Sequence, residues 1–376
     1  MKNTDTSLLS HFGTIKDPRI ERRRLHKLID IIAITIAAVI SGAEGWEDIE
    51  DFGKCKKVWL RGFLELPNGV PSHDTFRRVI SSIRASELQT CFVDWVQAVF
   101  KVTDGEVIAI DGKTARRSYE RGEANGHGPI HMVSAWASKA GFSLGQQKID
   151  AKSNEITAIP LLLRVLELKG CIVTIDAMGC QKNIVKQIIE QEGDYVVALK
   201  GNQSSLARGV EMSFEQAALR NYEGLEYDVC EDVDKGHGRI ETRRCETLSN
   251  LFWFDDANSW VGLKTIVKIT STREIKEKTT TATHYYISSL PLSSRKIADS
   301  IRSHWGIENS LHWVLDVSLK EDDSRIRTGD AQENLAILRR LAINALKRET
   351  SNKRGIKAKT KKCGWDNDYL QQVLVN

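Results

Sequence analysis

The chain has 376 residues, of which 41% are hydrophobic, enough to bury a sizeable core in two or three structural units. Its 54 Lys and Arg residues exceed its 50 Asp and Glu residues by only four, so the overall charge identifies no partner. The seven cysteines are scattered without a C-x-x-C pair, which argues against a disulfide framework or a zinc site and favours reduced thiols.

The most apolar stretch is LIDIIAITIAAVI at residues 28–40, which has 13 residues and contains Asp30. A membrane-spanning helix needs about 20 predominantly apolar residues, so this stretch predicts a buried helix of a folded domain. We expect no secretory signal ahead of it. We therefore expect a cytoplasmic protein that makes no membrane contact.

Residues 1–103 are predicted to form a helical N-terminal domain. Helices are expected at 28–40, 54–63, 71–83 and 85–101, with turn chemistry at Pro67-Asn68-Gly69. Short helices with a basic, Ser/Thr-rich second member resemble a helix-turn-helix arrangement, which predicts a DNA contact. A helical cap on the next domain explains the same pattern equally well.

The stretch VIAIDGKT at 107–114 begins an α/β region. Four apolar residues run into Asp111, as expected for a strand that is buried on both faces and ends at a carboxylate. The stretch CIVTIDAMG at 171–179 repeats the pattern and ends at Asp176. Because an ionised carboxylate is costly in a core, both side chains are expected in a cleft at one edge of the sheet.

The order of predicted elements across 104–203 is β-β-β-α-β-α-β. Strands are expected at 107–111, 130–138, 142–150, 171–176 and 194–199, with helices at 154–168 and 180–192. A right-handed crossover would bring strand 171–176 beside strand 107–111. This order predicts an α/β fold with a ribonuclease-H-like core, completed by residues 291–338. Residues 204–290, with β-like runs at 239–246, 264–271 and 280–288, are expected to form a mainly β insertion.

A third carboxylate, Glu308, lies on a helix predicted from about 293 to 317. At 100° per residue it falls in the apolar stripe of Ile301, Trp305, Leu311 and Leu315. His304 and His312 stand four residues to either side and provide an alternative explanation, a simple Glu–His pair. An acid on the face that meets the sheet needs a partner, and a metal ion shared with Asp111 and Asp176 would supply one.

Three carboxylates are hard oxygen ligands and predict Mg²⁺ or Mn²⁺, with two ions suited to in-line phosphoryl displacement. The surrounding basic residues are predicted to contact phosphate, although any one of them could be a solvated surface charge. Residues 239, 241 and 243 would share one face of a strand. The predicted phosphate contacts are Lys113, Arg116, Arg117, Lys200, His237, Arg239, Arg243 and Arg302.

Residues 339–376 form a basic C-terminal segment, expected to be a helical tail. Ten Lys and Arg residues lie between Arg339 and Lys362 against the single Glu349, a local charge of +9. Such a one-signed segment predicts a polyanion contact, with a solvated helix end as the alternative.

Several blocks of the sequence together resemble one known family, over roughly residues 20–375. SGAEGWEDIEDFG at 41–53 is similar to its amino-terminal region. The chain thus resembles the insertion-sequence transposases grouped with the H-repeat-associated proteins. The other matching blocks are IDGKT around Asp111, SNEITAIP at 153–160, DAMGCQK at 176–182, KGNQ at 200–203, HGR-x-E at 237–241 and HW-x-IEN-x-LHW-x-LDV at 304–317.

The resemblance implies a DDE transposase in which Asp111, Asp176 and Glu308 form the catalytic, metal-binding triad. Related transposases carry Tyr, Arg and Lys around the Glu, where this chain has Ile301, His304 and Leu315. His304 is thus a candidate replacement for the Arg, and the other two roles do not carry over. Further DNA-binding candidates in the matching blocks are Asn202, Gln203, His304, Trp305, Asn309 and His312.

The implied activity is metal-dependent cleavage at transposon ends, which exposes a 3′-hydroxyl that then attacks target DNA. The implied partners are double-stranded DNA, as terminal inverted repeats and target, and a second copy of the chain in a dimeric synaptic complex. Such a protein would be nucleoid-associated when bound to DNA. Two alternatives remain at this point: a catalytically silent DNA-binding remnant, and a structure-specific nuclease on the same core.

Overall fold

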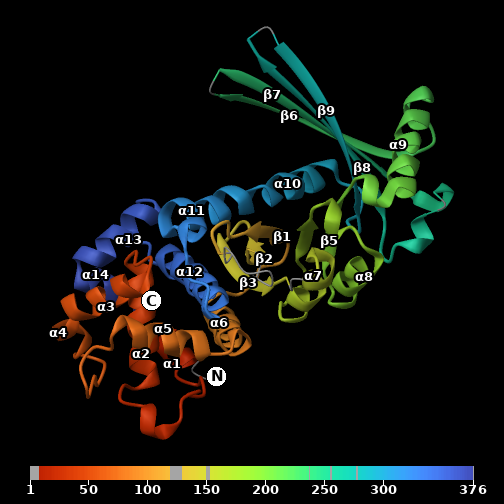
Figure 1. Cartoon of the computed structure of the whole chain (residues 1–376). Helices are drawn as coiled ribbons and strands as arrows, with labels where there is room; N and C mark the ends of the chain where they lie inside the picture. Colours follow the sequence, from red (N-terminus) through yellow and green to blue (C-terminus); the bar gives the residue numbers. More distant parts are fainter. Residues whose placement is uncertain are drawn as a thin grey trace.

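A computed structural model of the chain describes residues 8–118, 129–149, 153–236, 238–254, 256–276 and 278–375. Its centre is one nine-stranded sheet in the order β3-β2-β1-β4-β5-β9-β8-β7-β6, visible in Figure 1. The strands are β1 (Val107–Thr114), β2 (His131–Ala137), β3 (Phe142–Lys148), β4 (Ile172–Ile175), β5 (Asp194–Leu199), β6 (Glu226–Gly236), β7 (Arg239–Ser249), β8 (Thr265–Ile275) and β9 (Lys278–Ser288).

Strands β1, β4 and β5 run parallel at the centre of the sheet. The prediction that strand 171–176 lies beside strand 107–111 is confirmed, because β4 pairs with β1 from Val107–Ile172 to Ile110–Ile175. The strands β2 and β3 continue the sheet as an antiparallel hairpin next to β1. These central strands consist of continuous apolar runs and are buried on both faces, as expected for parallel strands inside a sheet.

Strand β1 is longer than predicted. It was expected to end at Asp111, but it runs to Thr114 because β2 pairs with it as far as Thr114–His131. Its parallel pairing with β4 nevertheless stops at Ile110. At Asp111, β1 is therefore still paired with β2 but no longer with β4. The edge of β1 that faces β4 is unpaired from this residue onward.

Helices pack around the central strands. Helix α7 (Glu155–Arg164) contacts β2 and β3, and α8 (Lys182–Glu190) contacts β5. Helix α10 (Ser294–His304) contacts β1, β4 and β5, and its Ile297 and Ile301 share an apolar cluster with Ile172 of β4. Helix α7 corresponds to the helix predicted at 154–168, but it is shorter than predicted and ends at Arg164.

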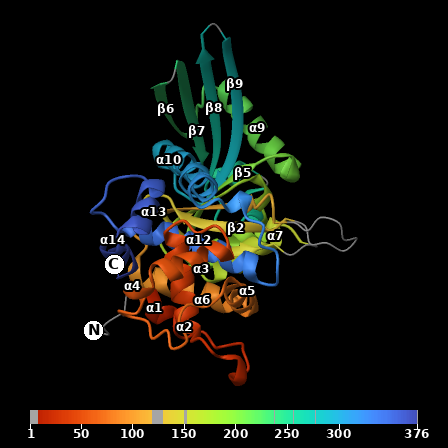
Figure 2. The ribbon, with the colours of Figure 1, turned by 60° about the vertical axis from the view of Figure 1, so that its left-hand side comes forward.

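The predicted insertion begins with a helix that the sequence pattern did not indicate, α9 (Ser204–Leu219). Strands β6 to β9 follow and form an arm that projects from the body of the molecule (Figures 1 and 2). The three β-like runs are confirmed within β7, β8 and β9, and β6 is an additional strand. The arm extends the central sheet, because β9 pairs with β5 between Tyr285 and Ser288.

The two ends of the chain pack together as helices. The N-terminal helices are α1 (Leu8–Phe12), α2 (Leu28–Ile40), α3 (Trp46–Cys55), α4 (Lys57–Leu60), α5 (His73–Ser82) and α6 (Ala85–Val99), of which α1 and α3 were not predicted. Helix α12 (Ala331–Arg348) contacts α2, α5 and α6, and α13 (Ile356–Trp365) and α14 (Asn367–Val375) complete the chain. Nowhere in the described ranges is a helix both long and apolar enough to cross a membrane.

The C-terminal segment differs from the predicted basic tail. The expected boundary at 338/339 lies inside α12, where Arg339 and Arg340 are 5% and 0% exposed. Lys359 is buried as well, with its ammonium donating to the Leu346 carbonyl at 2.8 Å and paired with Glu349. Much of the local charge is thus inside the fold, and the exposed basic residues of this segment are Lys353, Arg354, Lys357 and Lys361.

Candidate active site

Asp111 and Asp176 follow the last paired residues of two neighbouring parallel strands. Asp176 directly follows β4 and caps the short 3₁₀ turn Ala177–Gly179. Its carboxylate accepts hydrogen bonds from the backbone N–H groups of Met178 at 3.0 Å and Gly179 at 3.4 Å. Because Ile110 pairs with Ile175, the next residue on each strand is an aspartate, which brings the two carboxylates to one edge of the sheet.

Glu308 lies on a helix that changes its pitch. Helix α10 breaks at Trp305, residues Glu308–His312 form a π-helical turn, and α11 (Trp313–Leu319) follows. The stripe predicted at 100° per residue is wrong in part: Ile301, Leu311 and Leu315 are buried, but Trp305, where the helix breaks, is 65% exposed. Glu308 itself is 62% exposed. Single π turns occur frequently at functional sites.

His312 connects Glu308 to Asp111. Its Nδ1 lies 2.9 Å from Glu308 Oε2 and 3.6 Å from Asp111 Oδ2. The three side chains bring one ligand atom each to within 4.8 Å of one another. His312 is 3% exposed, so it does not reach the surface as the predicted DNA contact would require. Burial lowers the pKa of His312, which favours the neutral ring.

The charges around Asp111 suit a divalent cation. Burial raises the pKa of Asp111 to about 7, and the carboxylates of Asp176, Glu155 and Glu308 add to the effect. In the part of the chain that the structure describes, no Lys or Arg forms an ion pair with Asp111, Asp176 or Glu308. Converging oxygen donors without an organic counter-ion fit Mg²⁺ or Mn²⁺.

Lys113 does not reach the surface that a phosphate contact requires. Its side chain is only 8% exposed, and its Nζ lies 2.7 Å from Asp316, 2.8 Å from Asp322 and 3.5 Å from Glu321. Arg340 pairs with the same Glu321 at 2.9 Å. The prediction that Lys113 binds phosphate is thus corrected: the residue joins β1 to α11 and to the segment that follows α11.

Three residues of the predicted DNA contacts form hydrogen bonds that support the strand ends. The amides of Asn202 and Gln203 donate to the carbonyls of Ala177 and Cys180 at 2.5 and 2.9 Å, and so brace the turn that follows Asp176. His304 Nδ1 lies 3.0 Å from the Thr174 hydroxyl on β4. Burial lowers the pKa of His304, while the nearby Asp176 acts in the opposite direction.

The other predicted contacts are accessible to different degrees. Arg116 and Arg117 are 83% and 57% exposed and pair loosely with Asp322 and Asp323. Arg302 is 54% exposed and pairs with Asp234 of β6 at 3.1 Å. Lys200, Trp305 and Asn309 are also exposed.

On the arm, Arg239 and Arg243 lie on one face of β7 as predicted. Glu241 stands between them, 2.6 Å from Arg243 and 4.0 Å from Arg239, and the arginine side chains are 42% and 30% exposed. The remaining candidate, His237, lies outside the described residues.

Sequence reasoning missed a fourth carboxylate near the strand ends. Glu155, the first residue of α7, lies beside Gly112 of β1, and its Oε1 is 2.8 Å from His131 Nε2. The signal for it was present in SNEITAIP, a block noted for its resemblance and given no role.

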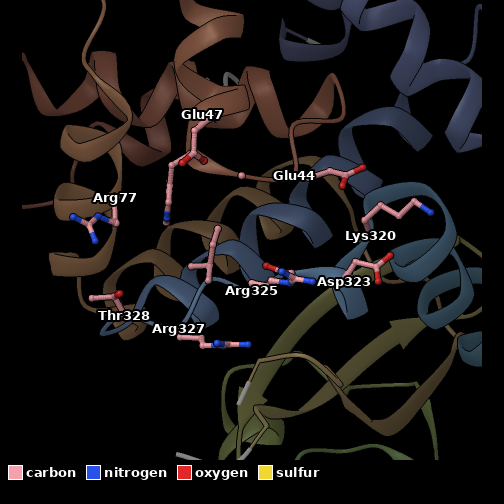
Figure 3. Close-up of a pocket in the computed structure, with 12 residues that line it drawn as sticks. Glu44, Glu47, Arg77, Lys320, Asp323, Arg325, Arg327 and Thr328 are labelled. Carbon is pink, nitrogen blue, oxygen red and sulfur yellow. The ribbon is translucent and has the colours of Figure 1, made fainter. Parts of the chain in front are cut away.

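A cavity of about 450 Å³ lies away from these carboxylates, between the N-terminal helices and the segment that precedes α12. Figure 3 shows basic and acidic side chains mixed around it. Its labelled lining residues are Glu44, Glu47, Arg77, Lys320, Asp323, Arg325, Arg327 and Thr328.

Comparisons with known proteins agree along almost the whole chain. Residues 102–345 match the family model described as "Transposase DDE domain", and residues 9–96 match "DDE_Tnp_1-associated". "Putative transposase YncI" of Escherichia coli O157:H7 is 43% identical over 375 residues, covering 98% of this chain and 95% of that protein. "H repeat-associated putative transposase YhhI" of Escherichia coli strain K12 is 44% identical over 374 residues, covering 98% and 97%.

A shorter relative from strain K12 carries a different description. "Inactive transposase YbfQ" is 50% identical over 74 residues, which cover 20% of this chain and 88% of that protein. The match reaches too little of this chain to include all of the positions described above.

Proposed function

This chain belongs to the DDE transposase family that includes the H-repeat-associated proteins, and from that premise we propose that it is an active DNA transposase. The observation that carries the proposal is the convergence of Asp111 and Glu308, within reach of one ion, beside the Asp176 strand end. We assign the catalytic triad to these three carboxylates. We further assign a ribonuclease-H-like fold to the strands β1 to β5, whose order 3-2-1-4-5 supports it.

In this proposal the triad holds Mg²⁺ or Mn²⁺, as two ions. Bound there, the cations activate an attacking oxygen and stabilise the leaving oxygen of an in-line displacement. The chain itself positions the donors: backbone N–H groups orient Asp176, and His312 orients Glu308. Neutral His312 fits this role because it adds no charge that would compete with a cation.

Two displacements follow at the same residues. In the first, water attacks phosphorus at the transposon end, the P–O3′ bond breaks, and a free 3′-hydroxyl leaves. In the second, that hydroxyl attacks a target phosphodiester, forming a new P–O bond and releasing the target's own 3′-hydroxyl. No protein–DNA bond is needed, so no Ser or Tyr nucleophile is assigned. We expect a homodimer, because two ends must be held together.

The exposed cations supply the proposed DNA contacts. Arg116, Arg117, Lys200 and Arg302 lie on elements next to the strand ends, and phosphate contacts of this kind provide most non-specific affinity. Exposed Trp305 and Asn309 flank Glu308 on its helix. We add Arg239 and Arg243 on the arm as contacts further from the site.

The test is cleavage of DNA that carries the element's terminal inverted repeats, with Mg²⁺. Asp111→Asn, Asp176→Asn and Glu308→Gln should each abolish cleavage and largely spare DNA binding, because the phosphate contacts are elsewhere. Glu190→Gln is a matched control, since Glu190 is helical and, at 61%, as exposed as Glu308.

Near-normal cleavage by any triad variant would remove that residue from the triad. Binding without cleavage by the unmodified protein would instead favour the catalytically silent remnant. Preferred cleavage of an RNA–DNA hybrid would favour the structure-specific nuclease.

A further inference from the structure

Two cysteines that look scattered in the sequence face each other in the arm. The antiparallel register of β6 and β7 pairs Cys230 directly with Cys245, so both side chains lie on the same face of the sheet. Cys245 belongs to the apolar cluster that contains Ile297 and Ile301 of α10, and Cys230 packs against that cluster. The fold therefore brings two free thiols together beneath α10.

The spacing of the two strands suits a disulfide. Directly opposed residues of antiparallel strands have Cβ atoms about 4.5–5.5 Å apart, and a disulfide needs about 3.5–4.5 Å. Strand β6 ends the sheet order and pairs with β7, so it can move inward without disturbing a ladder on its other side. A bridge formed by such a movement is strained, and strained bridges are the ones that are readily reduced again.

The two thiols have different surroundings. Cys245 is 2% exposed, whereas Cys230 is half-buried. Burial raises the pKa of the Cys245 thiol, and the charge and hydrogen bond of Cys230 add to this effect. Arg295 of α10 donates to Asp232 at 2.6 Å, and after that hydrogen bond the charge of Cys230 contributes most to the raised pKa of Arg295. A guanidinium beside a sulfur favours the thiolate, which is the nucleophilic form. Cys230 is thus the attacking thiol and Cys245 the resolving one.

We propose that Cys230 and Cys245 form a reversible dithiol–disulfide pair that is oxidised by a low-molecular-weight disulfide such as glutathione disulfide. The Cys230 thiolate attacks one sulfur of that disulfide, its S–S bond breaks, and one glutathione leaves as a thiolate that takes up a proton. The Cys245 thiol then loses its proton and attacks the Cys230 sulfur, which releases the second glutathione. Two protein thiols are oxidised to one disulfide, and one glutathione disulfide is reduced to two thiols.

The bridge would fasten the edge strand of the arm beneath α10. Asp232 and Asp234 of β6 already pair with Arg295 and Arg302 of α10, and the chain continues from this helix to Glu308. Oxidation adds a covalent bond between β6 and β7 at the same place. The inference does not depend on the proposed function, because it concerns the chemistry of two thiols that lie outside the candidate active site.

The first experiment incubates the folded, full-length protein in glutathione buffers of increasing disulfide content. The remaining thiols are then alkylated and the peptides mapped by mass spectrometry. We expect a peptide that links Cys230 to Cys245, and its loss after dithiothreitol. Cys245→Ala should stop at a glutathione adduct on Cys230, and Cys230→Ser should give no bridge. Cys55→Ser is the matched control, because Cys55 is an exposed cysteine of another helix whose loss should leave the yield of the bridge unchanged.

Three results of this experiment would overturn the proposal. The first is the absence of the linked peptide at every buffer ratio. The second is a glutathione adduct that persists on Cys230 of the unmodified protein, because Cys245 then does not reach it. The third is a Cys230–Cys230 link between two copies of the chain.

A second measurement tests whether the bridge fastens β6. Hydrogen–deuterium exchange of residues 226–236 should slow in the oxidised protein and recover after dithiothreitol. Cys230→Ser treated with the same buffer should show no such change, since it forms no bridge. Equal exchange in the oxidised and reduced unmodified protein would show that the bond does not hold the edge strand, which contradicts the structural part of the proposal.

Discussion

Two residues of strand β1, Asp111 and Lys113, point to the same face and belong to two opposite kinds of charge cluster. Lys113 is surrounded by Asp316, Glu321 and Asp322, and Arg340 adds a second cation to that group. Asp111 is surrounded by carboxylates and a neutral histidine, and within the described part of the chain it has no Lys or Arg partner.

The difference separates a structural cluster from the proposed cation site. Buried ion pairs persist when each charge has a partner, and breaking one leaves a costly isolated charge. A group of acids with no internal counter-charge is unfavourable by itself and is expected where an external cation completes it. The residue types alone predict that both clusters lie in a single cleft in which carboxylates and basic residues are mixed.

The largest effect on stability should come from the Lys113 cluster. Lys113→Met leaves its three acidic partners without their shared cation, and we expect a loss of about 3–5 kcal/mol in the free energy of unfolding. Chemical denaturation measures it. The control Lys186→Met removes an exposed lysine paired with Glu190, which should cost less than about 1 kcal/mol. Equal costs for the two variants would show that the clusters do not differ as described.

A divalent cation should stabilise the protein through the Asp111 cluster alone. At a Mg²⁺ concentration 100 times its dissociation constant, binding to the folded state adds about 2.7 kcal/mol to the free energy of unfolding. Asp111→Asn should lose most of this gain. Thermal unfolding across a Mg²⁺ series measures both, and an identical gain in the variant would place the cation elsewhere.

The pH dependence of stability should have opposite signs in the two clusters. The pKa of Asp111, ordinarily 3.8, is raised to about 7, so the folded state binds the extra proton and stability falls as pH rises between these values. Burial alone would raise the pKa of Glu321, but the charges of Arg340 and Lys113 lower it, so its contribution is present above 4.5 and lost as pH falls below that value.

Chelator-treated protein provides the measurement. Between pH 4 and pH 7, Asp111→Asn should gain stability relative to the unmodified protein, by at most about 1.4 kcal/mol per pH unit. A difference that does not change with pH in this window would contradict the raised pKa of Asp111.

The smallest effect concerns exposed cations that have no acidic cluster around them. Lys357 and Lys361 lie four residues apart on α13 and are exposed. If they contact phosphate, changing both to Ala lowers the slope of log affinity against log salt by about 0.9 for each contact. Lys359→Ala does not test this contact, because Lys359 is buried and cannot reach phosphate. An unchanged slope would assign these two lysines to solvent.

The sequence predicts best where chemistry is local. The apolar runs that end at Asp111 and Asp176 specify strands, and the crossover rule places them side by side without knowledge of distant contacts. The α2 helix is predicted with its exact limits, 28–40, because its apolar run stops at Ser41-Gly42. Local β-like runs also indicate the arm strands β7, β8 and β9. The alternation of polar and apolar residues in β6 is too weak to indicate a strand.

The errors come from partners far apart in the chain. The sequence identifies Lys113, Arg340 and Lys359 only as basic residues. The fold shows that they are buried and which acids and carbonyls pair with them. A fixed 100° period cannot indicate the helix break at Trp305 or the π turn that begins at Glu308, and Trp305 is exposed where the period predicts burial. Glu155 was missed because its position beside β1 depends on the space left by Gly112, 43 positions earlier.

The arm formed by β6 to β9 has a mechanical consequence. Its strands β8 and β9 are 11 residues long, and β9 continues without interruption into the ladder with β5, whose neighbour β4 ends at Asp176. A force applied at the tip is therefore transmitted through a continuous hydrogen-bonded sheet to the edge that carries the proposed catalytic carboxylates. The arm can rotate independently of the body only if the four β5–β9 residue pairs from 196–288 to 199–285 separate. A molecule bound at the tip therefore also determines the alignment of that edge.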